Sequence, residues 1–161
     1  MEPYPSQKNQ IHAGCAARRG PRGVDGHQTD SQGVLLLGPP GAGKSDLLLR
    51  LVDAGYDLVA DDRVDLAGGW ASAPAALAGL IEIRGMGIVR MPFLARARPV
   101  LVVRLVGPDD RPDRLPLPAH DPVTGLPEIR LDPALASAVA RVNLALDCQH
   151  GRCKILTSEQ M

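Results

Sequence analysis

Aromatic residues are the scarcest class in this sequence, in which Tyr4, Tyr56, Trp70 and Phe93 are the only ones. Surfaces that bind single-stranded nucleic acid need several aromatic side chains on which bases stack. The chain also has no excess of positive charge, because 18 Lys and Arg balance 18 Asp and Glu. Nucleic-acid-binding domains normally gather such an excess on one face. The composition therefore argues against a nucleic-acid partner.

Long apolar runs and a cysteine framework are missing as well. No run approaches the roughly 18 apolar residues of a membrane-spanning helix, and the start "MEPYPSQKNQ" lacks the apolar segment of a secretory signal. The odd number of cysteines, Cys15, Cys148 and Cys153, favours reduced thiols. We therefore expect a cytoplasmic protein with no membrane association. The sequence "CQHGRC" matches no standard zinc pattern.

A length of 161 residues predicts one domain with a single modest core. We expect a flexible N-terminus over 1–10, one domain over 11–147 and a solvated tail over 148–161. Gly, Pro and charged residues concentrate in two predicted surface loops, 18–32 and 107–125.

Hydrophobic patterning predicts an α/β fold with more strand than helix after residue 57. The stripe of Leu47, Leu48, Leu51 and Val52 predicts a helix that ends before Gly55. The expected helices are 44–54 and 71–79. The expected strands are 11–17, 34–37, 57–60, 80–84, 87–91, 100–106, 127–131 and 142–147.

A phosphate-binding loop lies between the predicted strand 34–37 and the predicted helix. It fits the pattern G-x-x-x-x-G-K-[ST] and consists of Gly38, Pro39, Pro40, Gly41, Ala42, Gly43, Lys44 and Ser45. Glycines let backbone N–H groups close around phosphate at a helix N-terminus. Lys44 can then reach the β- and γ-phosphates, and the Ser45 hydroxyl can ligate Mg²⁺. The pattern predicts nucleotide or polyphosphate binding without naming the reaction.

Two aspartates follow this loop at the end of the next predicted strand. Asp61 and Asp62 come 17 and 18 residues after Lys44, and a helix of about three turns returns the chain to the same edge of the sheet. Phosphoryl transfer needs a carboxylate that holds the metal shell or activates the acceptor. Adjacent side chains of an extended chain point to opposite faces, so the two carboxylates need not share a role. One can face the γ-phosphate while its neighbour orients a metal-bound water or Arg63.

A second motif makes the pattern more specific. The stretch "GPPGAGKSDLLLRLVDAGYDLVADDRVDL" is followed by "EIRGMGIVR", which begins at Glu82. From about residue 33 to residue 90 the chain resembles the catalytic domain of HPr kinase/phosphorylase, which phosphorylates and dephosphorylates a serine of the phosphocarrier protein HPr. The resemblance implies a P-loop-containing kinase domain with a strand-rich mixed sheet and few helices. It also implies that the chain is a short form without the family's separate N-terminal domain.

The resemblance implies a role for each matching residue. The P-loop would bind ATP, or pyrophosphate, and Ser45 and Glu82 would serve Mg²⁺. Asp62 would be the general base toward the acceptor serine and the general acid in the reverse reaction, with Asp61 beside it. Arg84 would lie in the loop tied to both activities.

Two positions depart from the family pattern. The family places a histidine on the strand before the P-loop strand; His12 fits if 18–32 is an insertion, whereas His27 is nearer in sequence but lies in that predicted loop. The family's later basic loop corresponds here to "LDPALASAVARV", where Arg141 is only an approximate substitute. An arginine stabilises the phosphoryl transition state strongly, so this difference bears on turnover and above all on the phosphorylase direction.

Three functions are compatible with these motifs. The best supported is an ATP- and Mg²⁺-dependent protein-serine kinase, with or without phosphorylase activity, that acts on an HPr-like phosphocarrier of a phosphotransferase system. The second is a small-metabolite kinase, which normally needs a helical lid carrying arginines, whereas this chain predicts strands after residue 80. The third is a nucleotide-sensing module without catalysis. Homo-oligomerisation is left open.

Overall fold

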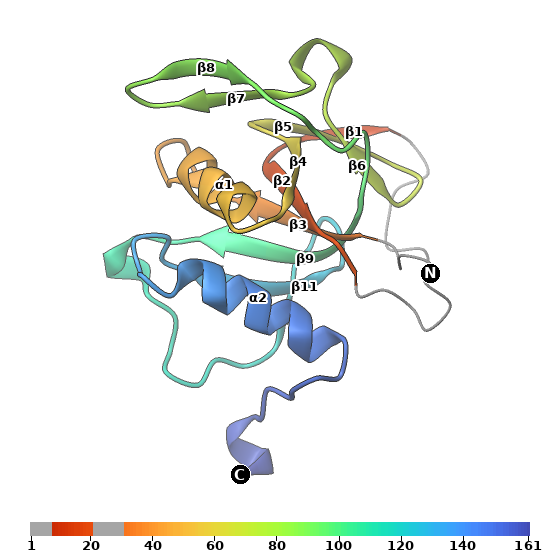
Figure 1. Cartoon of the computed structure of the whole chain (residues 1–161). Helices are drawn as coiled ribbons and strands as arrows, with labels where there is room; N and C mark the ends of the chain where they lie inside the picture. The colour runs from red at the N-terminus through yellow and green to blue at the C-terminus, as the bar shows by residue number, and fades with distance from the viewer. Residues whose placement is uncertain (1–7, 21–30) are drawn as a thin grey trace.

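The computed structural model describes residues 8–20 and 31–161, which fold into a strand-rich α/β domain (Figure 1). The strands are β1 Asn9–His12, β2 Gly14–Arg18, β3 Gln32–Leu37, β4 Asp57–Ala60, β5 Arg63–Ala67, β6 Trp70–Ser72, β7 Leu80–Ile83, β8 Gly87–Arg90, β9 Arg98–Leu105, β10 Ala119–His120 and β11 Pro127–Leu131. The helices are α1 Lys44–Asp53 and α2 Ala138–Gln149. Single 3₁₀ turns are η1 Ala75–Leu77, η2 Pro108–Asp110 and η3 Ser158–Gln160.

A central sheet of six strands has the order β10–β11–β9–β3–β2–β4. β9 runs parallel to both β3 and β11, whereas β2 is antiparallel to its neighbours β3 and β4. β3 and β4 therefore point the same way, and their carboxyl ends lie at one edge of the sheet. This topology explains how the chain brings the loop after β3 and the aspartates after β4 together.

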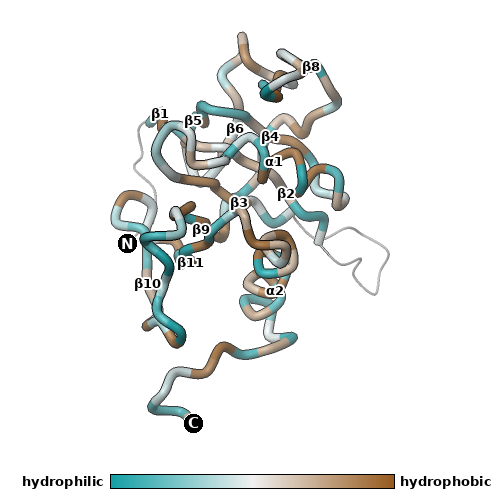
Figure 2. The backbone as a smooth tube through the Cα atoms, turned by 90° about the vertical axis from the view of Figure 1, so that its left-hand side faces the viewer, coloured by the Kyte–Doolittle hydropathy of each residue, from teal (hydrophilic) through white to brown (hydrophobic). Residues whose placement is uncertain are grey.

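Both faces of the central sheet are covered, which agrees with the continuous apolar run of β3. Val34 and Leu36 face a core shared with Leu48 of α1 and Leu146 of α2. Leu35 faces the second core, beneath the three-stranded sheet β1–β5–β6. The hairpin β7–β8 and the C-terminal segment lie at opposite ends of the molecule (Figure 2).

The expected strand 11–17 is two strands in two different sheets. β1 pairs with β5, and β2 pairs with β3 and β4. The chain crosses between the sheets at Ala13, whose N–H donates to the Asp62 carbonyl at 3.1 Å. Asn9 and Gln10, which we expected in the flexible N-terminus, are already part of β1; residues 1–7 lie outside the described residues.

Two predicted elements are wrong in type. The expected helix 71–79 contains the end of β6 and only the short turn η1, because Ala71 pairs with both Leu66 and Ala97 and Pro74 precedes the turn. The expected strand 142–147 is the middle of α2. Its alternating sequence resembles a strand, but Val142 and Leu146 point together into the core beside α1.

The expectation of reduced thiols is wrong for one pair. Cys148 and Cys153 form a disulfide, whereas Cys15 is free and buried. α2 ends at Gln149 and the chain turns back at Gly151, whose φ is 78°. This turn brings the two cysteine Cα atoms within 4.5 Å of each other.

Of the two predicted loops, 107–125 is mostly irregular, with only η2 and the short strand β10. Residues 21–30 of the loop 18–32, including His27, lie outside the described residues. No helix in the described part of the chain has the length and hydrophobicity that a membrane crossing requires.

Candidate active site

The loop between β3 and α1 has the geometry of a phosphate cradle. Gly41 and Gly43 have φ angles of 80° and 98°, a region that residues with a Cβ rarely adopt. Gly43 also caps α1, and the first N–H groups of a helix have no intrahelical acceptor. Together with the helix dipole, these N–H groups favour an anion at this position.

Lys44, the first residue of α1, is folded back over the loop. Its ammonium group donates hydrogen bonds to the carbonyl oxygens of Gly38 at 2.6 Å and Pro39 at 3.1 Å. These are neutral acceptors, and anionic phosphate oxygens bind an ammonium group more strongly. Lys44 is therefore placed to exchange its carbonyl partners for phosphate.

Asp61 is the buried connection between the cradle and the hairpin β7–β8. Its side chain accepts a hydrogen bond from the Ser45 hydroxyl at 2.7 Å and another from the backbone N–H of Glu82 at 2.9 Å. The residue is only 7% exposed. The carboxylate of Asp61 thus links the start of α1 to the strand β7.

Asp62 faces solvent, unlike its neighbour. Its φ of 66° is the only positive value of a residue other than glycine in the ranges 8–20 and 31–161. Asp and Asn tolerate this left-handed conformation better than most residues, yet it still costs free energy. Asp61 is buried whereas Asp62 lines the cleft described below, so the two adjacent carboxylates have different surroundings.

One cleft of about 670 Å³ collects most of the predicted site residues. Its walls include Pro40, Gly41, Gly43, Lys44, Ser45, Asp62, Glu82 and Arg84. Glu82 and Arg84 belong to the hairpin β7–β8. On β7 the side chain of Ile81 is buried in the core, whereas Glu82 next to it is exposed. The hairpin therefore forms the wall that faces the cradle, and the cleft combines carboxylates with cations on either side.

The donor set of this cleft fits Mg²⁺ bound together with phosphate. Ser45 donates its hydroxyl proton to Asp61, which leaves its oxygen lone pairs available to a cation. Glu82 and Asp62 add carboxylates in the same cleft. Within the described residues no three His, Cys, Asp or Glu side chains form a metal cluster, and Mg²⁺ usually takes its other ligands from water and phosphate.

His12 does not line this cleft. It lines a second hollow of about 430 Å³ together with Gly38, Pro39 and Arg130. His12 ends β1 opposite Arg63 of β5. Its match to the family histidine stays a prediction.

The segment after β11 packs directly against the cradle, although no motif indicated it. Pro133 would contact a Cβ placed on Gly43 at 3.3 Å, and its carbonyl accepts a hydrogen bond from Arg50 of α1 at 2.6 Å. Arg141 is instead exposed on α2, where it bonds Ser137 at 2.8 Å, and it does not line the cleft. Arg141, the approximate substitute for the family's basic loop, thus lies outside the walls of the cleft.

Comparison with known proteins finds similarity to the same family over this region. Residues 28–95 match the family model described as HPr Serine kinase C-terminal domain. The HPr kinase/phosphorylase of Clostridium tetani is 39% identical over 82 residues, and that of Lactiplantibacillus plantarum is 43% identical over 100 residues. These alignments cover 47% and 52% of this chain, but only 26% and 31% of the relatives. The chain thus spans less than a third of these curated relatives.

The fold comparison extends over nearly the whole chain. The structure of the Hpr(Ser) kinase/phosphatase from Coxiella burnetii superposes with a TM-score of 0.70 at 24% identity, covering 89% of this chain and 97% of that chain. The resemblance to the catalytic domain of HPr kinase/phosphorylase and the strand-rich α/β fold class are both confirmed.

Proposed function

We propose that this chain is an ATP-dependent protein-serine kinase whose acceptor is an HPr-like phosphocarrier protein. The observation that carries the proposal is the convergence of Lys44, Asp62 and Glu82 on one cleft. A cation for the transferring phosphate, a carboxylate for the acceptor proton and an oxygen ligand for Mg²⁺ are the groups that phosphoryl transfer requires. The family of the relatives supports the identity of the acceptor.

In this proposal the P-loop binds the β- and γ-phosphates of ATP. Lys44 moves from the carbonyls of Gly38 and Pro39 to the phosphates and neutralises charge that passes to the leaving diphosphate. Bound Mg²⁺ supplies further charge stabilisation, and Ser45 and Glu82 are the residues that would hold it. Asp61 keeps the Ser45 hydroxyl oriented by accepting its proton in a hydrogen bond.

Asp62 is the proposed general base. It is exposed at the cleft, so it can meet the hydroxyl of a serine that belongs to another protein. A serine hydroxyl is a poor nucleophile until a positioned carboxylate takes its proton. Arg84 lines the cleft from the turn of the hairpin, and we propose that it stabilises the transferring phosphoryl group.

The hairpin favours a protein acceptor over a small metabolite. Met86 and Ile88, at its turn and on β8, are 77% and 73% exposed, and Ile88 lines the cleft. Exposed apolar side chains next to a cleft are typical of protein interaction sites. We propose that they contact the carrier around its acceptor serine.

The test is label transfer from γ-labelled ATP with Mg²⁺ to the HPr-like carrier of the same organism. A carrier whose acceptor serine is replaced by alanine is the control. Label on the native carrier alone supports the kinase, and its loss on adding inorganic phosphate supports the phosphorylase direction as well. Transfer to small hydroxyl compounds only, or ATP binding without any transfer, would contradict the proposal in favour of a metabolite kinase or a nucleotide sensor.

A further inference from the structure

A small pocket lies at the end of the central sheet opposite the cradle. It has a volume of about 200 Å³ and is lined by Arg18, Arg19, Gln32, His150 and Arg152. Gln32 begins β3, and the cradle follows the end of that strand, so six residues of about 3.3 Å each separate the two sites. At roughly 30 Å³ per water molecule, the pocket has room for one tetrahedral oxyanion with a small substituent.

Gln32 supplies an unused donor in this pocket. The residue is 4% exposed, and its side-chain Nε2 is buried without any hydrogen-bond partner. Exchanging the amide oxygen and nitrogen does not remove the problem, because Arg18 Nε donates to Gln32 Oε1 at 2.9 Å. Buried polar groups are nearly always hydrogen-bonded, so an orphan donor on a residue that lines a pocket points to a missing acceptor, which Nε2 would meet once the Gln32 amide turns into the pocket.

The charged groups around the pocket leave an excess of positive charge. Arg18 Nη2 pairs with Asp147 at 2.9 Å, and Arg19 pairs with Asp57 at 3.2 Å. Arg152 has no carboxylate of its own: its Nη1 lies 4.0 Å from Asp147 Oδ1, the oxygen that already pairs with Arg18. Three guanidinium groups therefore face two carboxylates. The side chain of His150 adds another group, and no hydrogen bond or ion pair of its ring is found in the described part of the chain.

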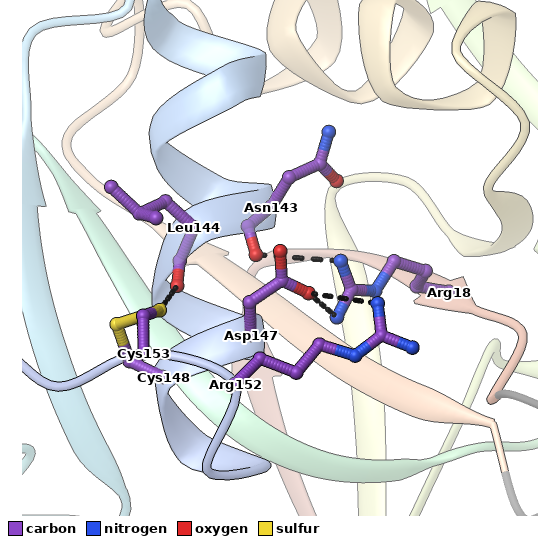
Figure 3. The surroundings of a disulfide bond; sticks show 7 residues. All are labelled: Arg18, Asn143, Leu144, Asp147, Cys148, Arg152 and Cys153. Atoms are coloured by element: carbon purple, nitrogen blue, oxygen red, sulfur yellow. Dashed lines mark hydrogen bonds and ion pairs between the residues drawn. A yellow bond between two sulfur atoms is a disulfide. The ribbon is translucent and has the colours of Figure 1, made fainter.

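The disulfide lies beside the ion pairs that Arg18 and Arg152, two of the residues lining the pocket, make with Asp147 (Figure 3). Cys148 and Cys153 bracket the turn that carries His150 and Arg152. The Cys153 sulfur also contacts the Leu144 carbonyl at 3.7 Å, which ties the turn to α2. Figure 3 shows Arg152 and Arg18 converging on Asp147 beside this disulfide. The crosslink thus limits how far Arg152 can move from Arg18.

We infer that this pocket is a binding site for a phosphate-sized oxyanion, either free phosphate or a phosphate monoester, and that the Cys148–Cys153 disulfide holds the turn with His150 and Arg152 in place. The anion accepts a hydrogen bond from Gln32 Nε2 and faces the guanidinium groups of Arg18, Arg19 and Arg152. Charge-assisted hydrogen bonds of this kind give Arg its preference for phosphate. The inference does not depend on the proposed kinase activity.

The test uses the full chain carrying Lys44→Ala, which removes the lysine of the P-loop so that phosphate binding there does not interfere. Inorganic phosphate and methyl phosphate are titrated separately at constant ionic strength, while NMR follows the side-chain amide of Gln32. We expect a saturable shift of this amide. Arg152→Gln, at an exposed position that should not disturb folding, is expected to weaken binding about tenfold or more. The matched control Lys154→Gln removes the same charge outside the pocket and is expected to leave the affinity unchanged.

The two anions distinguish the sources of the ligand. Equal affinity indicates that a monoester fits, whereas binding of inorganic phosphate alone indicates the free ion; both support the site. Absence of a saturable Gln32 shift, or equal weakening by Arg152→Gln and Lys154→Gln, would overturn it. In the double variant Cys148→Ser/Cys153→Ser we expect severalfold weaker binding, and an unchanged affinity would refute the role of the disulfide.

Discussion

Asp61 and Asp62 show how two identical side chains acquire different tasks from their surroundings. Asp61 is buried and accepts hydrogen bonds from Ser45 and from the backbone of Glu82. Asp62 is exposed and held in a left-handed conformation that points it into the cleft. The first carboxylate is held by hydrogen bonds, and the second is the one that we propose exchanges a proton with an acceptor.

This division predicts different effects of the same substitution on stability. Asp61→Asn replaces one acceptor oxygen by a donor N–H₂ group, so the Ser45 hydroxyl can no longer donate to that atom, and the hydrogen bond from the Glu82 N–H loses its charged acceptor. We expect a loss of about 1–3 kcal/mol in the free energy of unfolding. Asp62→Asn, at an exposed position, is expected to change it by less than about 0.5 kcal/mol. Urea unfolding of the two variants measures both values, and equal destabilisation would contradict the assigned roles.

Two buried groups predict how stability depends on alkaline pH. Burial raises the pKa of the Cys15 thiol from 9.0 to about 12. Burial likewise raises the pKa of Tyr56 from 10.0 to about 12, with an opposing effect of Arg18. In the unfolded chain both groups ionise at lower pH, so the free energy of the unfolded state falls relative to that of the folded state as the pH rises through 9 to 12.

The free energy of unfolding should therefore fall by about 1.4 kcal/mol per pH unit for each ionising group within that window. Below pH 9 the contribution is fully present. Cys15→Ala lowers stability at every pH because it leaves a cavity, but its slope between pH 9 and 11 should be shallower than that of the native chain. Urea unfolding at several pH values gives both slopes, and parallel curves would show that Cys15 does not titrate as expected.

At the scale of elements, local patterns predicted the parts of the fold that carry their own signal. β3 is a continuous apolar run buried on both faces, and α1 has an apolar stripe between a glycine-rich start and Gly55. β5 and β6 escaped prediction, and the break at Ala13 between β1 and β2 depends on which strands pair. Residues 142–147 of α2 were predicted as a strand because their apolar residues alternate. They form a helix that buries Val142 and Leu146 in the core shared with α1, a long-range contact that the local pattern does not reveal.

In the candidate site, too, the residues with a local sequence signal were predicted and those that depend on long-range contacts were not. The P-loop and the aspartate pair could be predicted because spacing along the chain is sufficient to place them at one edge of the sheet. The contact of Pro133 with Gly43 and the position of His12 could not, because each depends on long-range strand order. The hydrogen bonds of Asp61 also required coordinates, since the sequence indicated that the two aspartates differ in role but not which groups Asp61 contacts.

The hairpin β7–β8 gives a prediction about acceptor binding. Met86→Ser removes an apolar side chain that is 77% exposed at the hairpin turn, so folding should be little affected. We expect a higher KM for the carrier protein with little change in kcat, because the contact is made equally in the bound ground state and the transition state. Leu117→Ser, an equally exposed residue in the loop 107–125, is the matched control. Equal effects of the two substitutions would show that the hairpin does not recognise the carrier.

At the scale of the whole molecule, the central sheet separates two ends of different chemistry. The carboxyl ends of β3 and β4 hold the cradle and the aspartates, and the opposite end gathers arginines around Gln32. Helices cover one face of the sheet and the small sheet β1–β5–β6 covers the other (Figure 1). The fold agrees with that of the Coxiella burnetii structure over 89% of this chain.

The measurement that tests this account most directly compares ATP binding with phosphoryl transfer in the same variants. With Mg²⁺ and the HPr-like carrier present, Asp62→Asn should bind ATP nearly as well as the native chain but transfer the γ-phosphate roughly 10²–10⁴-fold more slowly, because it lacks the general base. Lys44→Ala should lose ATP binding itself. If Asp62→Asn phosphorylates the carrier at the native rate, Asp62 is not the base and the proposed mechanism is wrong.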